Sequence, residues 1–311
     1  MKQRPQQLTA VRAKNKHNFK RSIPLLVMFL PVILYYAIFK FEPMVGLVMA
    51  FQNFSLKKGF FGSEFIGLEN FQYIFETPIM IQVIKNTLVL GILNFVITFP
   101  FPILMALFIN EVRTMWFKKT VQTIVYLPHF LSWVIVGSMC FTIFSQESGV
   151  VNNILKAVTG ETYPFLYKPV SWTAIFVGSS IWKETGFAAI IYLAALGGID
   201  PTLYEAASLD GCGRVKQMIH VSIPCIAPTI IINLILKAGS IATVGFDQVY
   251  NLKTDPVMDV ADVISTWVYR VGLQQMQFGI STAMGLFNSL LSLILVFTVN
   301  AIARKYDKSL W

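Results

Sequence analysis

Residues 200–213 read Asp-Pro-Thr-Leu-Tyr-Glu-Ala-Ala-Ser-Leu-Asp-Gly-Cys-Gly and form a polar break between long apolar segments. Asp200 followed by Pro201 is typical of a helix cap and a first helical residue. The Leu and Ala residues that follow predict a short helix with one apolar side, which Gly211 ends. A second helical turn is expected through His220, and Pro224 is expected to open the next apolar segment. A short helix held between two spanning helices is suited to act as a lever.

The composition places the chain among membrane proteins. Of its 311 residues, 55% are hydrophobic and 13% are charged, whereas about a quarter of the residues in soluble domains are charged. Several uncharged runs of about 18 or more residues are long enough to cross a bilayer. The alternative, a large soluble helical protein, would have to bury these runs on every side. The net charge of +9 does not indicate a nucleic-acid partner, because the basic residues stand at the ends of apolar runs.

Six spanning helices are expected, which makes the fold class an all-α polytopic membrane protein. Their approximate ranges are 22–42, 82–109, 121–144, 171–196, 223–245 and 281–303. The spans form one transmembrane domain, 22–303, which contains the loop 200–224 and lies between a basic tail at 1–21 and a short tail at 304–311. The connection 42–81 is expected as an interfacial segment with a helix near 68–75, and the connections 145–170 and 246–280 are expected as polar loops.

The distribution of basic residues predicts the orientation of the bundle. The two termini and the connections 110–120 and 198–222 together hold 15 Lys or Arg residues, and the opposite connections hold 7 over a longer sequence. Because basic residues accumulate on the cytoplasmic side of a membrane, both termini and the loop 200–224 are expected in the cytoplasm.

No pattern of catalytic or metal-binding residues is evident in the sequence. The three cysteines have no paired spacing, and the three histidines are scattered. The sequence contains no nucleophile elbow, no His-Glu-x-x-His and no phosphate-binding loop. We therefore expect no catalytic residue, no metal site and no cofactor bound by this chain.

Polar residues inside the spans are candidates for a substrate path. A charged residue inside a bilayer costs about 2.5–3.5 kcal/mol on insertion scales, so Lys183, Glu184 and Lys237 each need a physical reason. One reason is a water-filled path that a polar solute contacts. The alternative is structural, either an ion pair that joins the fourth and fifth spans or a Lys237 side chain that reaches toward the interface. Further candidates for the path, with interhelical hydrogen bonds or interfacial anchoring as the alternatives, are Asn86, Asn94, Trp182, Tyr192, Asn233 and Asn288.

Two sets of motifs carry a family resemblance. Glu205-Ala206-Ala207, Gly211 and Ile223-Pro224 stand at a spacing that resembles the EAA loop of binding-protein-dependent ABC importer permeases. The segments 67–71, 181–183, 193–196 and 246–248 are similar to the carbohydrate-uptake branch, near the lipoprotein-operon, rhamnogalacturonan and alginate permeases. The resemblance extends over nearly the whole chain.

The resemblance implies the fold of a type I importer permease that forms half of the translocation path for an oligosaccharide, in a bacterial cell membrane. ATP and Mg would be bound and hydrolysed by two separate ATPase subunits, and a second, different permease would complete the path. The resemblance implies that the residues in contact with the ATPase are Tyr204, Glu205, Ala206, Ala207, Asp210 and Gly211. An extracytoplasmic sugar-binding protein would dock near Asp247, Gln248 and Tyr250.

Two other classes of membrane protein remain open on the residues alone. A stand-alone channel or secondary transporter for a polar solute would be supported by inverted repeats with broken helices, and no internal repeat is evident. An intramembrane enzyme would need a cluster of His, Asp or Ser residues at one depth within the spans, and none is evident either.

Overall fold

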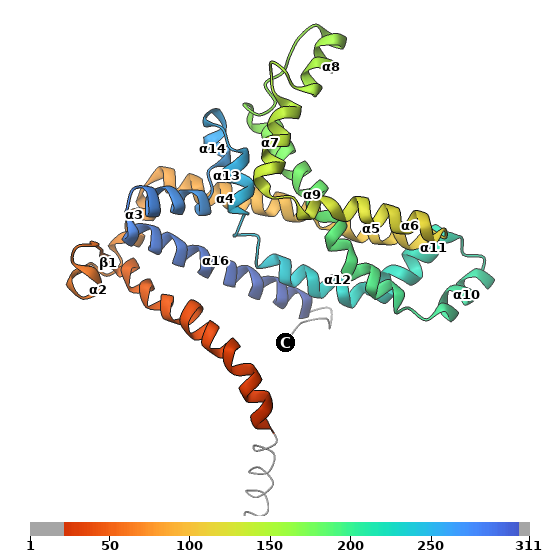
Figure 1. Cartoon of the computed structure of the whole chain (residues 1–311), viewed down its shortest axis with the longest axis horizontal. Coiled ribbons are helices and arrows are strands. Elements are labelled where there is room, and N and C mark those ends of the chain that lie inside the picture. Colours follow the sequence, from red (N-terminus) through yellow and green to blue (C-terminus); the bar gives the residue numbers. More distant parts are fainter. Residues whose placement is uncertain (1–21, 305–311) are drawn as a thin grey trace, which may run out of the picture.

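The computed structural model describes residues 22–304, which are almost entirely helical (Figure 1). Within this range one short antiparallel pair of strands occurs, β1 (Gln52–Asn53) with β2 (Glu64–Phe65). The expected cytoplasmic tails at 1–21 and, apart from residue 304, at 304–311 lie outside the described residues.

Among the described residues, five helices are long and apolar enough to cross a membrane, and a bent pair forms a sixth span if it is counted as one. Helices satisfy their own backbone hydrogen bonds, which the interior of a bilayer requires. The five are Ser22–Phe51, Pro78–Glu111, Pro169–Gly197 (α9), Arg214–Ala238 and Phe278–Ile302, and the last belongs to α16 (Phe278–Arg304). The bent pair is Met115–Phe130 with Trp133–Phe144. The ends of these helices differ from the expected ranges.

The first helix is longer than expected. It passes through the π-helical turn η1 (Ala37–Phe41) and continues beyond residue 42 as the 3-10 helix η2 (Glu42–Phe51), which packs against α16. Pro43 lies at the start of η2, directly after the wider π-helical turn. The interfacial segment predicted for 42–81 therefore begins after residue 51, and it contains two further helices, α2 (Gly59–Gly62) and α3 (Glu69–Glu76).

The second and third spans also differ from expectation. The second comprises α4 (Pro78–Thr98) and α5 (Pro100–Glu111) and begins at Pro78, because proline suits the first helical position. The third, expected as one helix over 121–144, is bent by 100° between α6 (Met115–Tyr126), with the 3-10 turn η3 (Leu127–Phe130), and α7 (Trp133–Phe144). The Ser132 hydroxyl accepts from the Ile135 N–H and caps the new helix.

The fifth span begins and ends earlier than the predicted 223–245. The segment α11 (Arg214–Gln217) runs through the π-helical turn η4 (Met218–Ser222) into α12 (Ile223–Ala238) without interruption, so Pro224 lies inside a continuous helix instead of opening one. Pro224 stands in the first turn of α12, directly after the wider π-helical turn that accommodates a residue without an N–H.

The expected polar loops at 145–170 and 246–280 are largely folded. The first contains α8 (Val150–Thr159). The second contains short helices that turn back onto the bundle: α13 (Phe246–Leu252), η5 (Asp255–Val257), α14 (Met258–Ala261), α15 (Ile264–Val268) and η6 (Tyr269–Gln274). The Asn86 amide on α4 donates to the carbonyls of Asp259 and Asp262, and the Arg270 guanidinium pairs with the buried Asp262 carboxylate. Polar side chains thus provide hydrogen-bond partners for the backbone of a segment that the sequence pattern alone predicts to be a loop.

The connections lie at two opposite sides of the bundle (Figure 1). Helices α2 and α3 lie toward the left of the view, and α8 and α14 lie toward the top. Helix α10 (Pro201–Leu209), α11 and the turn between α5 and α6 lie toward the right, and the described ends of the chain lie toward the bottom. We refer to the first as the loop side and to the second as the α10 side.

The largest buried cluster joins α9 to the folded segment on the loop side. Trp172 and Phe176 on α9 are fully buried, and the Trp172 indole donates to the Leu252 carbonyl at the end of α13. Trp172 is therefore a core residue. This packing fixes α13 against the middle of the bundle.

Candidate functional site

A charged network links the bend of the third span to α9. The Lys183 ammonium donates to the His129 carbonyl oxygen at 2.8 Å and lies 3.1 Å from Glu184 Oε1. His129 Nδ1 lies 2.8 Å from Glu184 Oε2. An interrupted helix leaves carbonyl groups without partners inside the helix, and Lys183 provides a donor for one of them. Lys183 and Glu184 form an ion pair within α9, and their hydrogen bonds with His129 connect α9 to the third span, so the alternative in which an ion pair joins the fourth and fifth spans was wrong.

Aromatic contacts hold this network in place. The His129 ring stacks on Phe187 with centroids 4.0 Å apart, and the Lys183 ammonium lies 5.3 Å from the centre of the Trp133 ring. The Lys183 side chain is 7% exposed, whereas that of Glu184 is 41% exposed. Lys183 is thus a structural cation, and Glu184 presents part of its carboxylate to open space.

That space is a polar cavity of about 170 Å³ at the centre of the bundle. Amide, hydroxyl, charged and aromatic side chains line it from α4, α7, α9, α12 and α13, together with a proline and a glycine. They are Asn94, Thr98, Pro102, Trp133, Ser180, Glu184, Thr185, Lys237, Gly245 and Gln248. Five elements far apart in the sequence therefore meet around one group of polar residues, an arrangement typical of ligand sites.

Lys237 lies where three hollows meet. It lines the polar cavity, a second hollow of about 150 Å³ that shares Asn94, and a third of about 430 Å³ lined also by Tyr192 and Asn233. Within residues 22–304 the Lys237 ammonium makes no hydrogen bond or ion pair. The side-chain oxygen of Asn94 is buried and has no partner among the described residues. Of these two groups, the Lys237 ammonium remains available to a solute.

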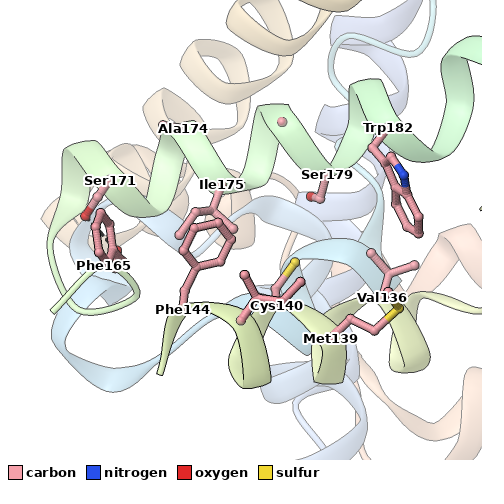
Figure 2. A pocket seen from close by; sticks show the side chains of 12 residues that line it. Val136, Met139, Cys140, Phe144, Phe165, Ser171, Ala174, Ile175, Ser179 and Trp182 are labelled. Atoms are coloured by element: carbon pink, nitrogen blue, oxygen red, sulfur yellow. Dashed lines mark hydrogen bonds between the residues drawn. The ribbon is translucent and has the colours of Figure 1, made fainter. Parts of the chain in front are cut away.

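Several residues predicted for the substrate path lie outside the polar cavity. Asn86 is buried, and its amide is engaged by the folded segment after α13, so it is a structural residue. Asn288 on α16 does not line any of the three hollows. Trp182 lies in a separate apolar groove of about 680 Å³ between α7 and α9, where Figure 2 shows it facing Val136 and Met139.

Gln248 is misplaced by the sequence-based prediction. It was expected to contact a docking protein, but it is buried, and its amide donates to the Phe176 carbonyl and the Ser180 hydroxyl. It therefore lines the central cavity. Asp247 and Tyr250 are exposed, so their predicted docking role stays a prediction.

The second candidate site is α10, which has no buried residue. The Asp200 carboxylate accepts from the Thr202 N–H, and this hydrogen bond lowers the pKa of Asp200 below its ordinary value, so the cap stays ionised. Gly211 ends the turn at φ +74°, a conformation that favours glycine. Glu205 is exposed, and Leu209 is 90% exposed. An exposed helix with apolar side chains at one end of a bundle is suited to contact another protein.

Side-chain hydrogen bonds connect α10 to the fifth span. Tyr204 Oη lies 2.9 Å from the hydroxyl of Ser222, which is buried in η4. The Gln217 amide donates to the Ser208 hydroxyl and to the Cys212 carbonyl. Because Ser222 and Lys237 belong to one continuous helix, a movement of α10 would be transmitted along this helix to the central cavity.

Sequence reasoning missed some residues of the site. His129 lies at the bend of the third span, and Thr98, Ser180 and Thr185 add hydroxyl groups to the cavity. The Pro128-His129 dipeptide inside an apolar run was the one signal that could have marked the bend.

The fold and these sites define a class of protein: a multi-pass membrane transport permease, with a polar cavity between its helices and an exposed helix at one side. The chain belongs to the family described as the binding-protein-dependent transport system inner membrane component, whose profile matches residues 98–308. This membership confirms the predicted family and the fold of a type I importer permease. It also confirms that the protein is a transport permease.

Relatives and solved structures agree with this membership. The chain is 44% identical to the polygalacturonan/rhamnogalacturonan transport system permease protein YteP of Bacillus subtilis, over 91% of this chain and 88% of that one. It is 42% identical to the protein LplB of the same organism, over 93% and 91%. A chain of a bacterial ABC transporter involved in the import of the acidic polysaccharide alginate matches with a TM-score of 0.85 and 41% identity, over 94% of this chain and 99% of that one. A chain of a bacterial alginate transporter, crystallised with a periplasmic protein bound to an alginate pentasaccharide, gives a TM-score of 0.86 and 42% identity, over 94% and 98%.

Proposed function

We propose that this chain is one transmembrane half of an ATP-driven importer whose path carries an acidic oligosaccharide delivered by an extracytoplasmic binding protein. The observation that carries the proposal is the cavity around Lys237, whose ammonium group makes no hydrogen bond or ion pair with the described residues. The substrates printed for the relatives, polygalacturonan/rhamnogalacturonan and the acidic polysaccharide alginate, support an acidic sugar.

The chemistry of the cavity suits a sugar that carries a carboxylate. Glu184 is already bonded to Lys183 and His129, so the charge of Lys237 is left for a solute. The hydroxyl groups of the cavity offer hydrogen bonds to sugar hydroxyls, and the Trp133 ring adds an apolar surface. An ammonium group in a cavity of low dielectric attracts a carboxylate more strongly than it would in water.

The size of the cavity supports a second permease subunit. Ligand pockets commonly enclose about 300–1,000 Å³, whereas this cavity encloses about 170 Å³. A path wide enough for an oligosaccharide is therefore completed by another chain, which we propose to be a different permease.

We propose that α10 is the contact with an ATPase subunit. Its exposed Leu203 and Leu209 would be covered in a cleft of that subunit, and Glu205 would make polar contacts there. The α10 side of the bundle is then cytoplasmic, as the distribution of Lys and Arg also predicts. Closure of the ATPase dimer would move α10 and, through Tyr204 and Ser222, the helix that carries Lys237.

Uptake by the reconstituted transporter tests this function. Lys237→Met should lower the uptake of an oligogalacturonate at least about tenfold, because it removes the charge that faces the solute. The matched control is Lys40→Met, the same change at an exposed position of the first helix. Oligogalacturonate uptake that is equal in the two variants would contradict the proposal, as would a preparation in which no ATPase subunit copurifies with the chain.

A further inference from the structure

A hairpin on the loop side carries large apolar side chains on its outer surface. It comprises residues 52–65, which contain β1, α2 and β2 and directly follow the first spanning helix. Figure 1 shows the hairpin projecting from the bundle beside the end of that helix. The proposed function makes no use of it.

The interior of the hairpin is held together by polar side chains. The Ser63 hydroxyl donates to the Gly59 carbonyl and accepts from the Ser55 N–H. The Gln52 amide donates to the Phe60 carbonyl at 2.8 Å. Ser63 is 8% exposed and Gln52 is 6% exposed. These hydrogen bonds close the turn with its polar groups inside.

The outer surface of the hairpin is apolar and basic. Leu56, Phe61 and Phe65 are each at least 64% exposed, and Phe61 is fully exposed. Lys57 and Lys58 are exposed next to Leu56. A surface in contact with water rarely gathers large apolar side chains while polar ones are buried beneath them, so this surface is suited to an apolar environment.

The contact with α16 gives the depth of the hairpin in the bilayer. Phe54 packs edge-on against Phe278 at the start of α16, and a Cβ at Gly279 would lie 2.7 Å from the Gln52 carbonyl oxygen. Helix α16 has 27 residues and is therefore about 40 Å long, whereas a bilayer with its headgroup regions is about 40–45 Å thick. The start of α16, and the hairpin that packs on it, therefore lie at the level of the headgroups on the loop side.

The apolar surface of the first helix continues into the hairpin. The most apolar part of Ser22–Phe51 has no buried residue within the bundle. Met44 and Val45, close to its end on the loop side, are each more than half exposed. The hairpin thus extends a surface that already faces the interior of the bilayer.

The residues at the tip of the hairpin have the chemistry of a membrane surface. Aromatic rings are suited to the boundary of the acyl chains, and a lysine beside them reaches the phosphate groups with its ammonium. We propose that the hairpin is an interfacial membrane anchor, in which Phe61 enters the boundary of the acyl chains and Lys57 and Lys58 bind the phosphates of anionic lipids. The anchor holds the loop-side ends of the first helix and of α16 at the bilayer surface.

Quenching of tryptophan fluorescence by brominated lipids tests this anchor. The full chain, purified with the subunits that accompany it, is reconstituted in nanodiscs as the wild type and as Phe61→Trp, and the emission of the six native tryptophans is subtracted. Lipids brominated near the headgroup end of the acyl chains should quench at least about half of the added emission, and lipids brominated near the chain ends should quench less of it. The matched control is Leu209→Trp, at a 90% exposed apolar position of α10 outside the spans, which neither lipid should quench.

A second measurement tests the two lysines. Phosphatidylglycerol added to phosphatidylcholine nanodiscs at low salt should increase the quenching of Phe61→Trp, and this increase should disappear when Lys57→Gln and Lys58→Gln are added. The proposal is overturned if Phe61→Trp is quenched no more than Leu209→Trp, because the hairpin would then lie in water or be covered by another protein. A response to phosphatidylglycerol that persists without the lysines would overturn their assignment to lipid phosphates.

Discussion

The close approach of α9 to α6 at Gly186 predicts a large effect from the smallest possible substitution. A Cβ at Gly186 would lie 1.8 Å from the carbonyl oxygen of Val125, whereas a real Cβ essentially never lies closer than 3.0 Å to another atom. Gly186→Ala therefore forces the two backbones apart by about 1.2 Å, the difference between these distances. His129 Nδ1 and Glu184 Oε2 are 2.8 Å apart across the same contact, and a shift of this size exceeds the margin for a hydrogen bond.

The energies of these effects add to a measurable loss of stability. Overpacking costs about 1–3 kcal/mol, and the lost hydrogen bond adds about 1 kcal/mol. The better helix propensity of alanine returns about 1 kcal/mol, so we expect a net loss of about 1–3 kcal/mol. The matched control is Gly178→Ala on the same helix, where a Cβ would meet no atom within 4 Å. That change should be neutral or stabilising by up to about 1 kcal/mol.

Thermal unfolding of the purified chain in detergent measures the difference. Gly186→Ala should melt several degrees below the wild type, and Gly178→Ala should melt at or above it. Equal melting of the two variants would refute the reasoning, because it would mean that α9 and α6 do not pack as closely as the structure shows.

Three further predictions concern the charged network and α10. Lys183→Met should lower the free energy of unfolding by about 1–3 kcal/mol. Adding Glu184→Gln should recover part of this loss in the same melting assay, because fewer buried groups then lack partners. Stability changes of the two substitutions that simply add would argue against the network. Gly211→Val should abolish uptake with a normal amount of inserted protein, because φ +74° strongly disfavours a β-branched side chain; normal uptake would exclude the lever. Tyr204→Phe should raise the number of ATP molecules hydrolysed per sugar imported, because it removes the hydrogen bond to Ser222. An unchanged ratio would show that this hydrogen bond does not transmit the movement of α10.

The central site was predictable only in part, because a one-dimensional pattern reports burial and charge but not neighbours. Glu184 and Lys237 were identified from the cost of charge in a bilayer, and both line the cavity. Gln248 lies in a segment whose polar composition is typical of a loop, and only its folding back onto α9 shows it as a cavity residue. The amide of Asn86 is as unusual within a span as that of Asn94, yet Asn86 is bonded to backbone carbonyls, whereas Asn94 lines the central cavity.

By itself, the sequence determined the class of the protein and the elements that its periodicity controls. Long uncharged runs require spanning helices, because a bilayer offers no hydrogen bonds to the backbone. The spacing of Glu205 and Gly211 identified α10 and the family of the chain. The tertiary structure decided the 100° bend of the third span, the pairing of Lys183 with His129 and Glu184, and the position of each polar group relative to the cavity. These features depend on contacts between residues far apart in the chain, where small changes in helix position decide which polar groups find partners and which remain free for a solute.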